Sequence, residues 1–263
     1  MLDCSIDPPL ASNPKSWFTK EMLAALKGQS IPNHVAIMMD GNRRWAKLQP
    51  KSMGLCAYDG HSAGAKGIFD IVEAAREIGI KVLTLWAFST ENWQRSSVEV
   101  KILMHIFEQY LLENRQKMVD KGVKFSVIGN LTPLPMSVKK EIEKTKEATK
   151  FENEIELVIA FNYGGKDDIT RAFIKIAEKL EKKELAKEAI SESLIASHLD
   201  TAQWFDPDLI IRTSAEIRVS NFMLWQLAYS ELYVTEVLWP DFKPVHLLEA
   251  ILDFQKRQRR IGK

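Results

Sequence analysis

Short apolar runs rich in β-branched residues alternate along the chain with longer stretches in which apolar residues recur at helical spacing. Strands of this length separated by helices are typical of βαβ units, which build a parallel sheet. The predicted strands cover residues 34–39, 82–88, 124–128, 155–161, 208–212 and 232–237. The predicted helices cover residues 61–78, 97–120, 133–150, 167–183, 191–199 and 244–258. The pattern therefore indicates an α/β fold.

Length and charge balance narrow the class further. With 263 residues, 46% of them hydrophobic, the chain can bury a complete core, and we expect one domain rather than two. Its 36 basic and 35 acidic residues leave a formal charge of +1, so no overall field attracts nucleic acid or an acidic surface. Any recognition of an anion must therefore be local.

The cysteines and the first residues bear on the cellular compartment. Cys4 and Cys56 lie far apart and lack the C-x-x-C spacing, which predicts unpaired thiols in a reducing compartment and argues against a zinc site. The N-terminus lacks the basic and apolar regions of a signal peptide, and no apolar run approaches a membrane span. We expect a cytoplasmic protein whose contact with the inner face of the membrane is at most peripheral.

Residues 1–30 are predicted to form an N-terminal arm ahead of a main domain over residues 31–263. Prolines limit regular structure in the first half of the arm. Apolar residues in its second half are spaced for one short amphipathic helix: Trp17, Phe18, Met22, Leu23 and Leu26. We expect this face to pack on the chain's own domain, and contact with a membrane is the alternative.

Polar segments follow four of the predicted strands. They read MDGNRRW, FSTENWQR, FNYGG and IRTSAEIRVSN. Ligands of open parallel sheets bind outside the carboxyl ends of the strands, so these segments are predicted to converge on one cleft.

The residues of these segments suit an anion. Guanidinium groups match phosphate oxygens, and backbone N–H groups at helix starts bind the same charge. A single arginine is more often part of a surface ion pair, but five behind three strand ends favour a diphosphate site. The residues concerned are Arg43, Arg44, Arg95, Arg212 and Arg218, with Gly41, Gly164, Gly165, Ser89, Asn92 and Ser220 beside them.

Asp40 stands among these cations. An acid in an anion site is repulsive unless a cation lies between it and the phosphate, and Mg²⁺ held by one or two carboxylates plus substrate phosphates resolves the conflict. Asp40 is therefore a candidate Mg²⁺ ligand. Glu231 is a second candidate, although its interpretation as a capping or paired carboxylate is equally open.

Other phosphate-binding patterns are absent from the sequence. No G-x-x-x-x-G-K-[ST] loop occurs, and no G-x-G-x-x-G follows a strand. The stretch DDIT lacks the third acid of the aspartate-rich motif of helical prenyl synthases, and Asp167 and Asp168 are expected to start a helix instead.

Together the polar segments resemble the successive blocks of the cis-prenyltransferase family, most closely its bacterial undecaprenyl diphosphate synthases. The matching blocks are HVAIMMDGNRRWAK, LTLWAFSTENWQRSSVEV, FNYGGKDDI and PDLIIRTSAEIRVSNFMLWQLAYSELYVTEVLWPDF. The likeness runs in order from His34 to the C-terminus. It implies one α/β domain with a six-stranded, mostly parallel sheet flanked by helices, a hydrophobic tunnel and assembly as a homodimer, with residues 31–263 as the catalytic domain.

The resemblance also implies a reaction. Isopentenyl diphosphate would condense repeatedly with an allylic primer such as farnesyl diphosphate, forming cis double bonds and releasing diphosphate. The product would be undecaprenyl diphosphate, the precursor of the lipid carrier for bacterial cell-wall synthesis. A cis-prenyltransferase of another product length is one alternative, and a non-catalytic subunit of a heteromeric synthase is another.

Individual roles follow from the same likeness. Asp40 would hold Mg²⁺ and promote departure of the allylic diphosphate, and Glu231 would help to position the metal or the second substrate. Asn92 and His61 match residues implicated in condensation and in binding, although without the match His61 would be interpreted as a helix cap or a surface imidazole. The other expected substrate-binding residues are Gly41, Asn42, Arg43, Arg44, Trp45, Ser89, Thr90, Glu91, Trp93, Arg95, Arg212, Arg218, Ser220, Arg260 and Gly262.

These residues divide between two substrates. Arg212, Arg218 and Ser220 match the pocket for isopentenyl diphosphate, while Arg260 and Gly262 match an R-x-G element that reaches into the partner subunit's site. The tunnel would be lined by apolar residues that an ordinary core would also contain: Leu85, Ala87, Phe88, Leu103, Ile106 and Ile159.

Two positions depart from the family pattern. Ala57 stands where relatives carry an arginine four residues before His61, and Lys51 is the candidate substitute. Ala215 replaces the glycine of R-T-[SG]-G-E, where a methyl group would strain a positive φ angle or crowd a ligand. We expect weaker isopentenyl diphosphate binding than in relatives with glycine, so Ala215→Gly should lower the KM.

Overall fold

The computed structural model describes residues 16–26, 30–54 and 56–258. In this part of the chain six strands form one sheet in the order β3-β4-β2-β1-β5-β6, and each neighbouring pair is parallel. The predicted α/β fold is thereby confirmed, with a sheet that is entirely parallel. The strands are β1 His34–Met38, β2 Val82–Ser89, β3 Val123–Ile128, β4 Ile155–Tyr163, β5 Leu209–Arg212 and β6 Glu231–Val234.

The helices connect the strands as predicted, with two differences. The α-helices are α1 Lys20–Ala25, α2 Asn42–Leu48, α3 Ala57–Lys66, α4 Ile68–Ile78, α5 Ser97–Asp120, α6 Met136–Ala148, α7 Gly165–Glu181, α8 Glu192–Ala196 and α9 Pro244–Gln255. The predicted helix over 61–78 is in fact two helices, because α3 ends and α4 begins at Gly67, which caps both. Helix α2, which directly follows β1, was not predicted. Short 3-10 turns include η2 Thr90–Gln94, η4 Gln226–Tyr229 and η5 Trp239–Asp241.

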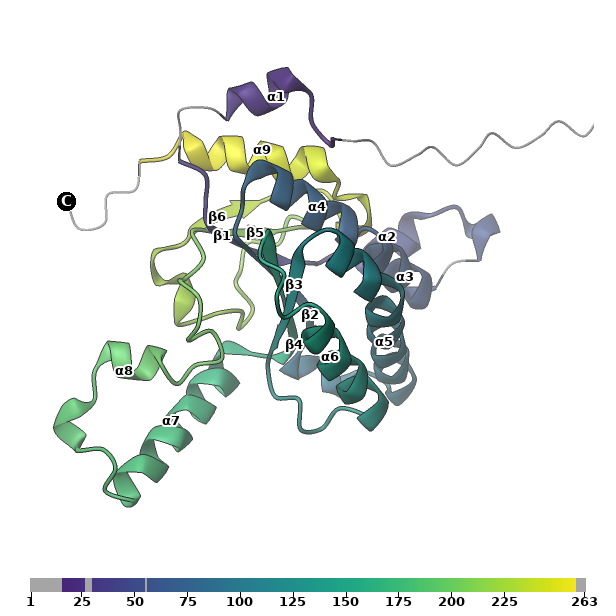
Figure 1. Cartoon of the computed structure of the whole chain (residues 1–263). Helices are drawn as coiled ribbons and strands as arrows, with labels where there is room; N and C mark the ends of the chain where they lie inside the picture. Colours follow the sequence, from purple (N-terminus) through teal and green to yellow (C-terminus); the bar gives the residue numbers. More distant parts are fainter. Residues whose placement is uncertain (1–15, 27–29, 55, 259–263) are drawn as a thin grey trace, which may run out of the picture.

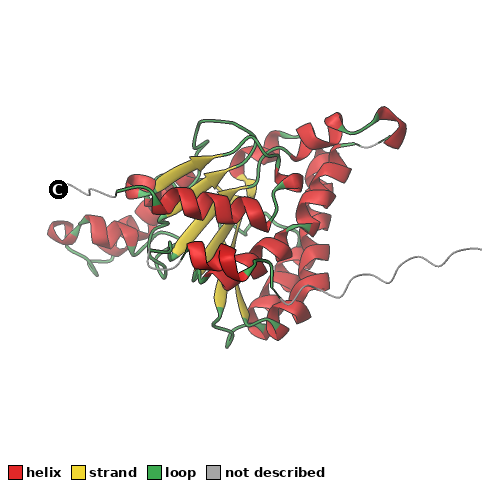
Figure 2. Ribbon diagram, turned by 90° about the horizontal axis from the view of Figure 1, so that it is seen from above, coloured by secondary structure: helices red, strands yellow, loops and turns green. Residues whose placement is uncertain are grey.

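The two faces of the sheet are covered differently. Alternate residues of a strand point to opposite faces, so Val35 and Ile37 of β1 join the large core under the helices, whereas Ala36 and Met38 join a smaller cluster. That smaller cluster contains Phe222 and Met223, which follow β5 in sequence. The loop after β5 therefore packs directly on the sheet. Figure 2 shows the twisted sheet between the surrounding helices and loops.

Helix α1 packs on the main domain, as the amphipathic pattern predicts. Phe18 and Leu26 are buried in the large core, and Trp17 donates its backbone N–H to Glu77 Oε2 at 2.8 Å. Figure 1 shows α1 beside α9, near the amino ends of the central strands. At the other end of the molecule, α7 and α8 project from the body. No helix within the described ranges combines the length and apolar character needed to cross a membrane.

Helices α2 and α3 touch through a glycine. A Cβ atom at Gly60 would lie 2.1 Å from the backbone oxygen of Asn42 and 3.3 Å from Ala46 Cβ. Only a residue without a side chain lets the two helices approach this closely. Because α2 begins directly after β1, this contact fixes the direction in which the helix leaves the strand.

We expect Gly60→Ala to lower the free energy of unfolding by about 2 kcal/mol or more, since α2 and α3 must separate to admit a methyl group. Gly67→Ala is the matched control, because a Cβ atom there lies 3.8 Å from its nearest neighbour, Gly64 O. Urea unfolding of both variants provides the comparison. Equal unfolding midpoints for the two would contradict the close approach of α2 and α3.

Candidate active site

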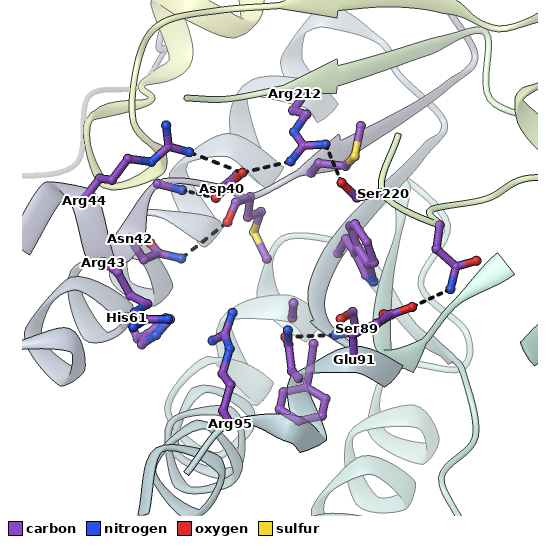
Figure 3. A pocket seen from close by; sticks show the side chains of 18 of the residues that line it. Asp40, Asn42, Arg43, Arg44, His61, Ser89, Glu91, Arg95, Arg212 and Ser220 are labelled. Carbon is purple, nitrogen blue, oxygen red and sulfur yellow. Dashed lines mark hydrogen bonds and ion pairs between the residues drawn. The ribbon is translucent and has the colours of Figure 1, made fainter. Parts of the chain in front are cut away.

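A cavity of about 720 Å³ lies at the carboxyl ends of β1, β2 and β5. It brings together twelve of the residues predicted from sequence: Asp40, Gly41, Asn42, Arg43, Arg44, His61, Ser89, Glu91, Asn92, Arg95, Arg212 and Ser220. Figure 3 shows Arg44, Asp40, Arg212 and Ser220 on one side of the cavity and Arg95, Ser89 and Glu91 on the other. Three of the four polar segments thus converge as expected.

Asp40 is positioned by its own backbone and by β5. Its N–H donates to Thr213 Oγ1 at 2.9 Å, and its carbonyl accepts from the Thr213 hydroxyl at 2.7 Å. Its carboxylate accepts from Gly41 N–H at 2.7 Å and from Arg212 Nη2 at 3.0 Å. Burial opposes ionisation, but these hydrogen bonds and the charges of Arg212 and Arg44 outweigh it, so the pKa of the Asp40 carboxyl lies below its ordinary value. Asp40 is therefore an anion at neutral pH.

Arg212 is the buried cation of the site, with its side chain 7% exposed. One guanidinium nitrogen, Nη2, binds Asp40, and Nη1 donates to Ser220 Oγ at 2.9 Å and to the Arg218 carbonyl. Its Nε is buried without a hydrogen-bond partner. Burying a charged guanidinium costs free energy, and these hydrogen bonds and the ion pair with Asp40 compensate for that cost.

Arg44 lies in the first turn of α2 and also faces the loop after β5. Its Nη1 donates to the Ser214 carbonyl at 2.9 Å, and its Nη2 lies 3.5 Å from Asp40 Oδ2. Glu216 approaches Arg44 Nη1 at 3.3 Å and pairs with Arg218 as well. The two carboxylates hold Arg44 at the rim of the cavity.

The charges of two cations, Arg95 and Arg43, act on His61 of α3. Its Nε2 is 3.5 Å from Glu99 Oε1 and makes no hydrogen bond, while Arg95 Nη1 donates to the same Glu99 oxygen at 3.1 Å. Burial, followed by the charge of Arg95, lowers the pKa of the His61 imidazole, and Glu99 only partly opposes this. At neutral pH His61 is thus a neutral imidazole that faces the cavity.

The segment after β2 is held by its own cap. Asn92 Oδ1 accepts from the Ser89 N–H at 3.1 Å, and the Ser89 hydroxyl accepts from the Asn92 N–H, which forms a capping box around η2. Asn42 on the opposite wall has a buried Oδ1 with no hydrogen-bond partner. A buried polar atom of this kind is costly unless a ligand or water satisfies it.

Several predicted site residues do not line this cavity. Trp45 donates to Asp241, Trp93 donates to Asn162, and Arg218 is exposed and paired with Glu216. Thr90 also lies outside the lining, and the segment after β4 places Gly164 and Gly165 against the loop after β5 instead. Arg260 and Gly262 lie outside the described residues.

Glu231 does not join Asp40 within one subunit. It is the first residue of β6 and is in register with Leu209, the first residue of β5, so it lies at the amino end of the sheet. Its Oε2 accepts from Arg257 Nη1 at 2.9 Å. The interpretation as a paired carboxylate therefore describes Glu231 in this structure.

Lys47 and Asn221 line the cavity without having been predicted. Lys47 follows Arg43 by one turn of α2, a signal that the sequence contains once α2 is recognised as a helix. The cavity lining then holds five cations and two carboxylates: Arg43, Arg44, Lys47, Arg95 and Arg212 against Asp40 and Glu91. Its charge suits an anion of several negative charges.

The two departures from the family pattern have different outcomes. The side chains of Lys51 and Ala57 are outside what the structure describes, so the substitution of Lys51 for an arginine stays a prediction. Ala215 has φ +63°, in the left-handed region, and its side chain is exposed. The positive φ angle is the condition under which a methyl group strains the backbone, while weaker isopentenyl diphosphate binding stays a prediction.

An apolar cavity of about 70 Å³ adjoins the polar one. Both are lined by Met39, Asn42, His61, Trp86 and Ala87. Four predicted tunnel residues line the apolar cavity: Ala87, Leu103, Ile106 and Ile159. Phe88 lines the polar cavity instead, and Leu85 is buried in the large core. The apolar cavity is also lined by Phe107, Phe161 and Tyr110, and the Tyr110 hydroxyl is buried without a hydrogen-bond partner.

A resident metal would need ligands from outside the chain. Among the residues that the structure describes, no three His, Cys, Asp or Glu side chains are grouped so that they could hold an ion. Asp40 could contribute a carboxylate in this cavity, and Mg²⁺ is commonly bound by one or two carboxylates with waters and substrate phosphates. The donor set therefore fits Mg²⁺ that arrives with a diphosphate.

Comparison with known proteins gives consistent likenesses. The profile of the family described as "Putative undecaprenyl diphosphate synthase" matches residues 38–262. The isoprenyl transferase of Chlamydia abortus is 49% identical over 240 residues, covering 91% of this chain and 96% of that protein. A lavandulyl diphosphate synthase from Lavandula x intermedia, solved with dimethylallyl diphosphate, has a TM-score of 0.85 at 38% identity and covers 89% of this chain and 99% of its own. A "probable undecaprenyl diphosphate synthase" from Campylobacter jejuni has a TM-score of 0.73 at 31% identity and covers 89% and 100%.

We expect Ala215→Gly to raise the free energy of unfolding by about 1 kcal/mol, because glycine removes the cost of a Cβ atom in the left-handed region. Ala228→Gly is the matched control. Ala228 is an exposed residue of η4 without a positive φ, so glycine there should lower stability by roughly 0.5–1 kcal/mol. Denaturant unfolding measures both. A loss of stability in both variants would show that Ala215 is unstrained.

Proposed function

Because the chain belongs to the undecaprenyl diphosphate synthase family, we propose that it is an isoprenyl transferase that condenses isopentenyl diphosphate with an allylic diphosphate such as farnesyl diphosphate. One observation carries the proposal: a cation-rich cavity shares five lining residues with an apolar one. A prenyl diphosphate has the same two parts, a diphosphate and a hydrocarbon chain. The enzyme would act repeatedly to give undecaprenyl diphosphate.

The cations of the cavity would bind and activate the diphosphate. Breaking the allylic C–O bond develops negative charge on the leaving group, and fixed guanidinium and N–H donors stabilise that charge where it appears. Arg44, Asn42 and the Gly41 backbone would cradle the allylic group, with Arg95 nearby. Arg212 and Ser220 would hold the isopentenyl diphosphate. Asn92 and the neutral His61 would act in condensation, with His61 able to accept a proton.

Mg²⁺ is the metal we propose for Asp40. When bound, it would neutralise diphosphate charge and assist departure of the leaving group. Asp40 keeps its negative charge at neutral pH, and Arg212 and Gly41 orient its carboxylate. The apolar walls would exclude water from the allylic cation.

The chain is proposed to act as a homodimer. Leu232 and Val234 are 47% and 38% exposed on β6, which is the edge strand of the sheet. On the projecting α7, Phe173 and Ile174 are 68% and 50% exposed. Exposed apolar side chains on an edge strand and on a projecting helix favour burial by a partner. A second subunit could also supply Arg260 and Gly262 to the site.

An active enzyme fits the site better than a non-catalytic subunit does. A subunit that only supports a partner has no need of a metal ligand placed among residues that bind phosphate. Here Asp40, Arg44 and Asn92 all line one cavity. The product length remains a proposal, since it depends on how the apolar cavity opens. Membrane contact is proposed to be peripheral and to come through the lipid product.

We expect purified protein with Mg²⁺ to convert farnesyl and labelled isopentenyl diphosphates into a long prenyl diphosphate, and EDTA to stop the reaction. Asp40→Asn keeps an acceptor for Arg212 but loses the charge, and should lower kcat about a hundredfold or more. Asp120→Asn, an exposed substitution at the end of α5, is the control. Product chromatography gives class and chain length together. Transfer without metal, or an active Asp40→Asn, would contradict the proposed role, and no transfer at all would favour the partner-subunit alternative.

Tyr110 is expected to limit the hydrocarbon chain, because its buried ring lines the apolar cavity and not the polar one. Tyr110→Ala should shift products to longer chains. Tyr110→Phe is the control: it keeps the ring and removes a hydroxyl that has no hydrogen-bond partner, so product length should not change. The same chromatography separates the products. If Tyr110→Ala folded and gave the wild-type distribution, the ring would not bound the chain.

A further inference from the structure

The loop after β5 holds an unusual number of left-handed residues. Ser214, Ala215, Ser220, Asn221 and Met223 all have positive φ angles between +44° and +75°. This conformation is unfavourable for side chains other than glycine, so the surrounding structure must hold it in place. The loop is therefore maintained by its contacts.

Asn221 makes the contacts that fasten this loop to two other segments. Its Nδ2 donates to Glu91 Oε1 at 2.7 Å, and its Oδ1 accepts from the Lys166 N–H at 2.9 Å. Its backbone carbonyl accepts from the Gly165 N–H at 2.6 Å. One residue thus ties the loop to η2 after β2 and to the start of α7 after β4.

Residues on either side restrict the position of the Asn221 side chain. A Cβ atom at Gly164 would lie 2.7 Å from Asn221 Nδ2 and 2.6 Å from Thr90 Oγ1, so a larger residue there would displace the amide. After Asn221 the chain turns into the core, where Phe222 stacks on Trp86 with ring centroids 4.8 Å apart. The amide is therefore held in one place.

Asn221 completes a connected wall around the cavity. On one side Asp40 binds Arg212, and Arg212 binds Ser220. Ser220 is adjacent to Asn221, which binds Glu91 on the other side of the cavity. Figure 3 shows Ser220 and Glu91 facing each other across this gap. Ser220 and the Arg212 guanidinium are thus connected, through the neighbouring Asn221, to Glu91 on the other side of the cavity.

We propose that Asn221 is a positioning residue for the second diphosphate: it holds the loop after β5 so that Arg212 and Ser220 point at isopentenyl diphosphate. This rests on the proposed function. Asn221 acts through Arg212 and Ser220, and its hydrogen bonds go to Glu91, Lys166 and Gly165 rather than to Gly41, Asn42 or Arg44 of the allylic cradle. Loss of its contact with Glu91 should weaken one substrate selectively.

A donor–acceptor exchange tests this pair. Asn221→Asp keeps the acceptor for Lys166 but replaces the donor to Glu91 with a second carboxylate. Glu91→Gln alone keeps an acceptor for Asn221 and measures separately what loss of the Glu91 charge does to both KM values. In the double variant the amide introduced at position 91 can donate to the carboxylate introduced at position 221, which restores the hydrogen bond with its direction reversed. A role confined to folding would not predict this pattern in KM.

We expect Asn221→Asp to raise the KM for isopentenyl diphosphate about tenfold, the size of a lost hydrogen bond to a charged group, with the KM for farnesyl diphosphate within about twofold of wild type. The double variant should recover most of the loss. An unchanged KM in Asn221→Asp, an equal rise for both substrates, or no recovery in the double variant would overturn the proposal.

Calorimetric binding of inorganic diphosphate provides a measurement that does not require prenyl transfer. Asn221→Asp should weaken this binding, and the double variant should restore it. If wild-type protein transferred no prenyl group, the proposed function would fail, while the binding comparison would still test Asn221. Equal diphosphate affinity in wild type and Asn221→Asp would count against the positioning role.

Discussion

The ion pair between Asp40 and Arg212 is the contact on which the site depends. It joins Asp40, two residues beyond the end of β1, to the last residue of β5, and the carboxyl ends of these neighbouring strands meet at one edge of the sheet. Burying Arg212 is tolerable because Asp40, Ser220 and the Arg218 carbonyl all bind its guanidinium. The same bonds keep Asp40 ionised and aimed at the cavity. One interaction thus places both the proposed metal ligand, Asp40, and the guanidinium proposed to bind phosphate, Arg212.

The rest of the polar cavity is built outward from this pair. Arg44 of α2 forms an ion pair with Asp40. Helix α2 in turn packs against α3 through their close approach at Gly60. Helix α3 presents His61, whose imidazole is neutral because burial and Arg95 lower its pKa. The cavity lining consequently carries more cations than carboxylates, and this positive charge surrounds the space where a diphosphate would bind.

Sequence patterns were sufficient for most of the fold but not for all of the site. The alternation of strands and helices indicated the parallel sheet, and α5 covers the predicted residues 97–120. Helix α2 was missed because it is short and polar, and with it the cavity-facing position of Lys47. The predicted helix over 61–78 breaks at Gly67, a local change of direction that helical periodicity does not reveal.

What the sequence by itself determined is that the polar segments after β1, β2 and β5 share a site, since the carboxyl ends of parallel strands lie at one edge. Only the tertiary structure decided which side chains enter it. Arg212 and Arg218 are six residues apart, yet one is buried against Asp40 and the other is exposed. Glu231 belongs to the amino end of β6. The physical reason is that side-chain direction in the loop after β5 follows from left-handed backbone angles, and contacts with segments distant in sequence, such as that of Asn221 with Glu91, maintain those angles.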